Sequence, residues 1–199
     1  MKHCTRVRLA ALTAVAALGL TACGSGETVV DKPKAKASTK ADSGSGTGKK
    51  PAAAKKSAAP GVAKIGDTLS LKGMDDGSKL DVTVVKVVDP AKSADEFTVP
   101  ADGKRFVGLQ FRLVNTGTKA YGDSPANGVQ IADEQGQQFD TTFADITAGQ
   151  SMSSDVRLKP GAKALGWIVF EVPKGVKPAT AQFAMDSGFA DQTGEWKLR

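Results

Sequence analysis

The chain has 199 residues, with 27 lysines and arginines against 21 aspartates and glutamates, a formal net charge of +6. Residues 1–22 carry three basic residues and no acidic one, residues 24–62 carry eight lysines against three acidic residues, and residues 63–199 carry 16 basic and 18 acidic residues. This distribution argues against a nucleic-acid-binding fold, which would carry a basic patch on the domain itself, and no nucleic-acid partner is expected.

The first 22 residues have the layout of a secretory signal. Lys2, Arg6 and Arg8 precede a mostly apolar stretch at 9–20, and small residues follow it. The apolar stretch is too short to span a bilayer. We therefore predict that residues 1–22 are a cleaved signal peptide.

A cysteine follows the predicted cleavage point. The run Leu20-Thr21-Ala22-Cys23 resembles a bacterial lipobox, in which an aliphatic and two small residues precede the cysteine that receives the lipid. A thiolate is the nucleophile that a lipid donor can alkylate. Lipoproteins of this kind carry a diacylglyceryl thioether, often with a further acyl chain such as palmitate, and two or more chains anchor a protein stably. The resemblance implies attachment to the cell membrane through Cys23, on its extracytoplasmic face; an ordinary signal with a coincidental cysteine is the alternative.

Residues 23–62 comprise the cysteine and a segment built almost wholly of Lys, Ala, Ser, Thr, Gly, Pro and Asp. The segment has no aromatic residue, so it cannot bury enough apolar surface to offset the entropy of ordering. We predict a disordered tether. Its lysines either attract anionic envelope polymers and headgroups or simply keep the tether solvated and extended.

Residues 63–199 show strand patterns throughout and no helical period over ten or more residues. Apolar and polar residues alternate between turn signals, and after Val84 the alternation changes phase, which indicates a bulge or a strand buried on both faces. The predicted strands are residues 67–71, 80–88, 105–115, 129–132, 138–143, 153–158, 164–172, 180–185 and 194–198.

The clearest strand is 105–115, where four apolar residues share one face: Val107, Leu109, Phe111 and Leu113. Turns are predicted at 115–117, 133–136 and 159–161, and a long loop at 121–127. About eight short strands in a single domain predict an all-β fold, an immunoglobulin-like two-sheet β-sandwich, with an OB-type barrel as the alternative architecture.

A series of motifs in this domain carries a family resemblance. In chain order they are Gly66-Asp67-Thr68-Leu69, the strand from Gly103 to Leu109, Val114-Asn115-Thr116-Gly117, the hairpin from Ile131 to Phe139, Leu158-Lys159-Pro160-Gly161 and the strand from Gly166 to Pro173. Together they resemble the telokin-like, immunoglobulin-like domain of unknown function that recurs in lipoproteins of Gram-positive bacteria. The resemblance implies a sandwich exposed outside the membrane, and it brings no catalytic residues.

The residue inventory predicts that the protein is not an enzyme. The only histidine, His3, and Cys4 lie in the predicted signal, and Cys23 is assigned to lipid. Without them, nucleophile pairs with histidine and zinc or copper sites on imidazole or thiolate cannot form. Neither a nucleotide-binding glycine motif nor a GxSxG sequence is present. We therefore expect no metal and no cofactor.

The residues that remain as candidates for catalysis are paired carboxylates at 75–76, 95–96 and 133–134. Their neighbours are turn residues, and none has the spacing of a calcium loop. A cleft holding two carboxylates would favour an enzyme acting on cell-wall or glycan substrates. That is the alternative to our main hypothesis, a non-catalytic binding or scaffolding domain.

Two aromatic residues are candidate ligand anchors. Trp167 is out of phase with Ile168 and Phe170, so we expect it to face outward or towards a flanking loop. Exposed beside Tyr121, it would offer a large contact area to a protein or glycan ligand; alternatively, both faces of its strand are covered. Trp196 is predicted to lie in the core.

Overall fold

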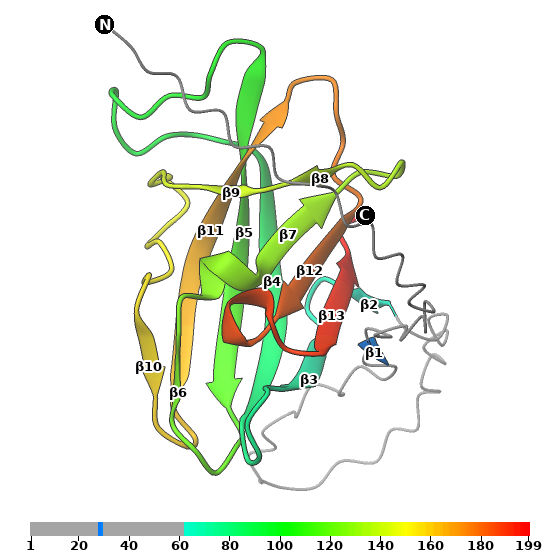
Figure 1. The fold of residues 1–199 in the computed structure, drawn as a ribbon. Helices are drawn as coiled ribbons and strands as arrows, with labels where there is room; N and C mark the ends of the chain where they lie inside the picture. Colours follow the sequence, from blue (N-terminus) through cyan, green and yellow to red (C-terminus); the bar gives the residue numbers. More distant parts are fainter. Residues whose placement is uncertain (1–27, 30–61) are drawn as a thin grey trace, which may run out of the picture.

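The computed structural model describes residues 28–29 and 62–199 (Figure 1). The predicted signal, the lipobox from Leu20 to Cys23 and nearly all of the predicted tether lie outside the described residues. No helix in the described part of the chain has the length and apolar character needed to cross a membrane.

The described residues form two main sheets and one short ribbon. One sheet has the order β3-β4-β5-β11-β9, built from Thr68–Lys72, Lys79–Ala91, Lys104–Asn115, Lys163–Pro173 and Thr141–Thr142. The other has the order β1-β13-β12-β7-β8, built from Thr28–Val29, Gln192–Lys197, Thr180–Ala184, Val129–Ala132 and Gln138–Phe139, with β2 (Ala63–Lys64) also pairing with β13. The ribbon pairs β6 (Tyr121–Asp123) with β10 (Val156–Leu158). These layers are the predicted immunoglobulin-like sandwich, and the barrel alternative is wrong.

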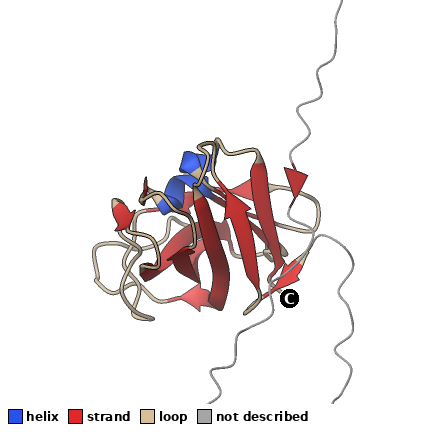
Figure 2. Ribbon diagram, turned by 90° about the horizontal axis from the view of Figure 1, so that it is seen from below, coloured by secondary structure: helices blue, strands red, loops and turns tan. Residues whose placement is uncertain are grey.

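Almost all of the regular structure is strand. Figure 2 shows the molecule from one end, with the two short helical turns (blue) together on one side. These turns are η1 (Pro125–Gly128) and η2 (Asp186–Gly188). The sequence shows no helical period, and the described residues accordingly contain 3-10 turns but no α-helix.

The core lies between the two sheets, and its pattern follows the predicted alternation. The four residues predicted to share a face of β5 are all fully buried. Phe111 contacts Phe183 of the opposite sheet with ring centroids 5.9 Å apart, and it meets Trp196 edge-on at 6.5 Å. The prediction that Trp196 lies in the core is confirmed, because its side chain is fully buried.

The phase change in β4 is a bulge. The pairing with β5 shifts register between Val84 and Lys86. Beyond it, Val87 packs against the main core and Val88 against a second apolar cluster on the other side of the sheet. The predicted bulge is therefore confirmed, and beyond it the strand is partly covered on both faces.

Two expectations were wrong in detail. The loop predicted at 121–127 contains β6 and η1, because Tyr121 is buried in the core and pairs with Leu158. The strand predicted at 138–143 is two strands: β8 pairs with β7 in one sheet, and β9 pairs with β11 in the other. Alternation within a segment does not show which sheet each half will join.

Candidate functional site

The two predicted anchor residues are buried and lie apart. Trp167 is 4% exposed and Tyr121 is 5% exposed, so neither side chain lies open on the surface as a ligand anchor. Tyr121 belongs to the main core, where its hydroxyl donates to Asp123, and Trp167 belongs to the second cluster. Burial, followed by the nearby Asp123 and Asp186 carboxylates, raises the pKa of Tyr121, so this phenol stays neutral.

Trp167 does project from the outer face of its strand, as its phase predicted. It is covered there by the segment that connects β9 to β10. Ile146 from that segment packs with Trp167, Val169 and Phe106 in the second cluster. Gly108 of β5 leaves the necessary room, since a Cβ atom there would lie 2.5 Å from Ile146 Cδ1. The alternative that both faces of this strand are covered is therefore confirmed.

Backbone hydrogen bonds fix this segment to its neighbours. The amide of Ala94 donates to the carbonyl of Asp145 at 2.8 Å, which joins the β4–β5 loop to the β9–β10 segment. The amide of Met152 donates to the Trp167 carbonyl at 2.7 Å, and the Trp167 amide donates to the Gln150 carbonyl at 3.0 Å. The β4–β5 loop and the β9–β10 segment are thus joined to each other, and the β9–β10 segment is joined to β11. Together they form one continuous rim along β11.

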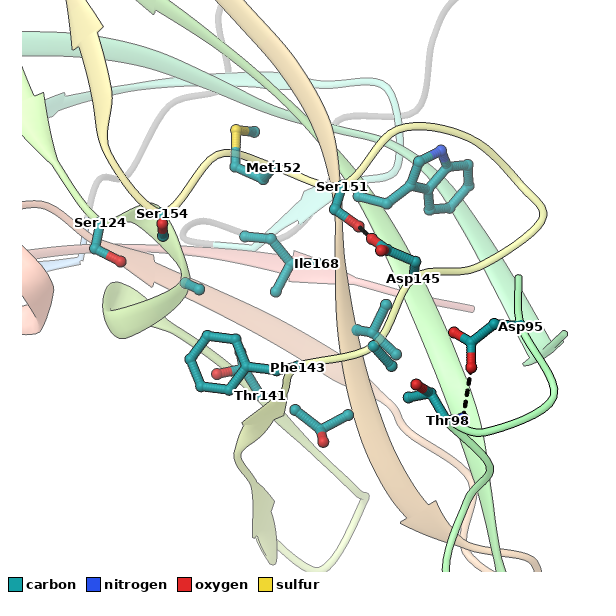
Figure 3. Close-up of a pocket in the computed structure, with 15 residues that line it drawn as sticks. Asp95, Thr98, Ser124, Thr141, Phe143, Asp145, Ser151, Met152, Ser154 and Ile168 are labelled. Atoms are coloured by element: carbon teal, nitrogen blue, oxygen red, sulfur yellow. Dashed lines mark hydrogen bonds between the residues drawn. The ribbon is translucent and has the colours of Figure 1, made fainter. Parts of the chain in front are cut away.

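This rim encloses a cleft of about 360 Å³ at the edge of the sandwich, here called the edge cleft (Figure 3). The residues that line it are Asp95, Thr98, Ser124, Ala126, residues 141–145, Ser151, Met152, Ser154 and residues 167–169. In Figure 3, Ile168 lies near the middle, with Ser124 and Ser154 on one side and Asp145 and Asp95 on the other. The volume falls within the range typical of small-ligand sites.

The two most exposed apolar side chains of the described residues, Phe143 and Phe97, lie on the cleft wall and in the loop that contributes Asp95 and Thr98 to it. Phe143, which lines the cleft, is 94% exposed, and the β4–β5 loop presents Phe97 at 87% and Val99 at 64%. Leaving such rings in water costs hydrophobic free energy, which a folded protein tolerates mainly where the rings meet a partner. The sequence did not indicate Phe143, because uninterrupted alternation would put it on the same face as Phe139, which is buried.

Two carboxylates lie in the edge cleft, and both accept hydrogen bonds from the protein. Asp95 accepts from the amides of Thr98 at 2.7 Å and Phe97 at 2.8 Å, and these bonds, the Thr98 bond foremost, lower the pKa of Asp95. Asp145 accepts from the Ser151 hydroxyl. A glycosidase needs one carboxyl group whose pKa is raised, so that it can protonate the leaving group. The shift at Asp95 runs in the opposite direction.

The other predicted carboxylate pairs serve turns. The Asp133 carboxylate accepts from the amides of Gln135 and Gln137, each at 2.9 Å, and Gly136 has a φ of 82°, as the predicted hairpin turn requires. The backbone carbonyl of Asp75 closes its own turn by accepting from the Ser78 amide at 2.9 Å, and its carboxylate lies 3.5 Å from Lys119 Nζ. Within residues 28–29 and 62–199, no three His, Cys, Asp or Glu side chains are grouped closely enough to hold a metal ion.

Three solved structures show a partial likeness to the chain. A secreted protein of Mycobacterium tuberculosis, MPT63, is 18% identical, with 71% of this chain and 99% of that chain covered and a TM-score of 0.48. The yjhA protein of Bacillus subtilis is also 18% identical, with 69% and 100% covered and a TM-score of 0.49. A β-sandwich protein of Clostridium difficile is 10% identical, with 75% and 100% covered and a TM-score of 0.39.

A search of curated proteins found no match. The model of one protein family does match, over residues 72–194, which begin at the end of β3 and end within β13. The matched segment is more than half of the chain and includes every residue that lines the edge cleft. The chain therefore belongs to the DUF4352 family, whose description is a domain of unknown function.

Proposed function

We propose that this protein is a lipoprotein, anchored by lipid on Cys23 at the extracytoplasmic face of the cell membrane, whose sandwich domain binds a ligand without catalysing a reaction. The observation that carries the binding role is the edge cleft with the ring of Phe143 exposed on its wall. The anchor rests on the sequence Leu20-Thr21-Ala22-Cys23 and the apolar stretch before it.

The chemistry of the cleft favours binding over catalysis. Asp95 and Asp145 are held as hydrogen-bond acceptors, and the direction of the Asp95 pKa keeps that group ionised at neutral pH. Hydrogen-bond acceptors beside hydroxyl groups and an aromatic ring can orient a ligand. The lowered pKa of Asp95 is the opposite of what the proton donor of a carboxylate-dependent glycan hydrolase requires.

The anchor is tested by replacing the cysteine. Cys23→Ala should abolish incorporation of labelled palmitate in producing cells and release the protein from the membrane fraction. Cys4→Ala is the matched control and should leave both labelling and fractionation unchanged. Labelling that persists in Cys23→Ala would refute the lipid attachment.

The binding role is tested by comparing two exposed phenylalanines. The full chain is crosslinked on intact producing cells and recovered as the wild type, Phe143→Ala or Phe189→Ala. Phe189 is 78% exposed, does not line the edge cleft and serves as the control. Crosslinked material should be lost in Phe143→Ala alone.

A separate assay tests for hydrolysis of isolated wall polymers. The binding proposal predicts no product. Hydrolysis by the wild type that disappears in Asp95→Asn and Asp145→Asn would establish the enzymatic alternative instead.

A further inference from the structure

The edge cleft lies where one sheet ends. β9 is the last strand in the order β3-β4-β5-β11-β9, and it pairs with β11 through Val169 and Phe170. Residues 141–145, which comprise β9 and the three residues after it, all line the cleft. An edge strand has one row of backbone N–H and C=O groups without strand partners, and these can pair with an added strand. The cleft therefore combines a side-chain pocket with β9, the short edge strand of one sheet.

The apolar side chains around the cleft match a polypeptide surface. Phe143 lies on the cleft wall, and Phe97 and Val99 project from the β4–β5 loop, which is joined to this wall through the pairing of Ala94 with Asp145. Exposed aromatic and aliphatic groups around a groove are typical of sites that receive side chains of a protein partner.

Charge defines the partner further. Asp95 and Asp145 line the cleft, and no lysine or arginine is among the residues that line it. The backbone hydrogen bond from Ala94 to Asp145 also joins the two loops that carry these carboxylates. An ammonium or guanidinium group is the complement of a pair of carboxylate side chains.

We propose that the edge cleft docks an extended, basic segment of a partner polypeptide, which adds along the edge at β9 and places a lysine or arginine between Asp95 and Asp145. The proposal rests on the proposed function, because it takes the edge cleft as the ligand site. Alternate side chains of the added segment meet Phe143 and the floor of the cleft, while its backbone pairs with the edge strand.

The test uses the detergent-solubilised full chain and three fluorescent probes. These are a hexapeptide of alternating valine and lysine, the same peptide with glutamate for lysine, and an oligomer of N-acetylglucosamine. Fluorescence anisotropy should show binding of the lysine peptide at least about tenfold tighter than the glutamate peptide, as expected for two exposed ion pairs. Adding N-methyl groups to alternate residues of the lysine peptide should weaken binding by a similar factor, because edge pairing needs the amides.

Matched variants distinguish binding at the edge cleft from a general attraction of the basic peptide to acidic groups on the protein. Asp95→Asn with Asp145→Asn should weaken binding of the lysine peptide about tenfold. These asparagines keep an acceptor for Phe97, Thr98 and Ser151. Asp75→Asn with Asp133→Asn makes the same change in net charge away from the cleft, and Asp133 likewise accepts amide hydrogen bonds. That control should bind like the wild type.

The outcomes distinguish this inference from the function on which it rests. Equal weakening in both double variants, or no effect of N-methylation, would overturn peptide docking. Binding of the N-acetylglucosamine oligomer that is lost in Phe143→Ala, with no binding of the lysine peptide, would also overturn it while leaving the edge cleft as a ligand site. If Phe143→Ala changes neither probe binding nor crosslinking on cells, both proposals are wrong.

Discussion

Asn115 connects three parts of the sandwich through one side chain. It ends β5 and is 1% exposed. Its Nδ2 donates to the carbonyls of Lys119 at 2.8 Å and Leu158 at 2.9 Å, and its Oδ1 accepts from the Gly117 amide at 2.9 Å. The predicted turn at 115–117 is confirmed, and the side chain explains why that turn stays next to β10.

Replacing this side chain should destabilise the fold. Asn115→Ala removes the donor to the carbonyls of Lys119 and Leu158, so the free energy of unfolding should fall by about 1–3 kcal/mol. Urea denaturation monitored by fluorescence measures the change. Asn127→Ala, at an exposed position, is the control and should stay within about 0.5 kcal/mol of the wild type. Equal stability of the two variants would contradict this role.

Glu171 gives the stability of the domain a defined dependence on pH. The Ala101 amide donates to Glu171 at 2.7 Å and Lys104 Nζ donates at 3.0 Å, and these bonds, the Ala101 amide foremost, lower the pKa of Glu171 from its ordinary value of 4.5. A lowered pKa in the folded state means that the contribution is fully present above pH 4.5 and is lost as the pH falls through the folded value.

We therefore expect Glu171→Gln to melt at a lower temperature than the wild type at pH 7, and the difference to shrink as the pH falls below 4.5. Thermal unfolding followed by circular dichroism between pH 7 and 3 measures this difference. Glu134→Gln, in the exposed β7–β8 turn, should follow the wild type throughout. A difference that stays constant down to pH 3 would show that the ionised form of Glu171 contributes nothing.

At the scale of elements, the wall of the edge cleft depends on a close crossing of two segments. Residues 150–152 run beside Trp167 of β11, where Ser151 forms a parallel bridge with it. A Cβ atom on Gly166 would lie 2.5 Å from the Cα atom of Met152. Only a glycine lets the two backbones approach this closely.

Gly166→Ala should therefore push this segment off β11. The expected loss in stability is about 1–3 kcal/mol, as for other overpacked sites. Hydrogen exchange should become faster at the amides of Met152 and Trp167, which lose their acceptors, the carbonyls of Trp167 and Gln150. Gly122→Ala, where an added Cβ meets no atom within 4 Å, is the control. Unchanged protection of the Met152 amide in Gly166→Ala would contradict this arrangement.

For the whole molecule, local pattern predicted most strands and little of the candidate site. Alternation located β5 and β11, the bulge after Val84 and the core position of Trp196, because each depends on residues close in sequence. The pairing of β6 with β10 and the split between β8 and β9 depend on partners distant in sequence. The phase of Trp167 was predicted correctly, but its burial depends on Ile146 from another segment. For the same reason the exposed Phe143 was missed: its strand changes sheet at Asp140.

We infer that this domain meets its ligand at the edge cleft, on the cell surface. The most direct measurement replaces Phe143 with the photoreactive residue p-benzoylphenylalanine in the full chain, in producing cells. Irradiation should give a discrete adduct at position 143 and none when the same residue replaces Phe189. Asp95→Asn with Asp145→Asn should reduce the adduct. Identical adducts at both positions, or none at position 143, would contradict it.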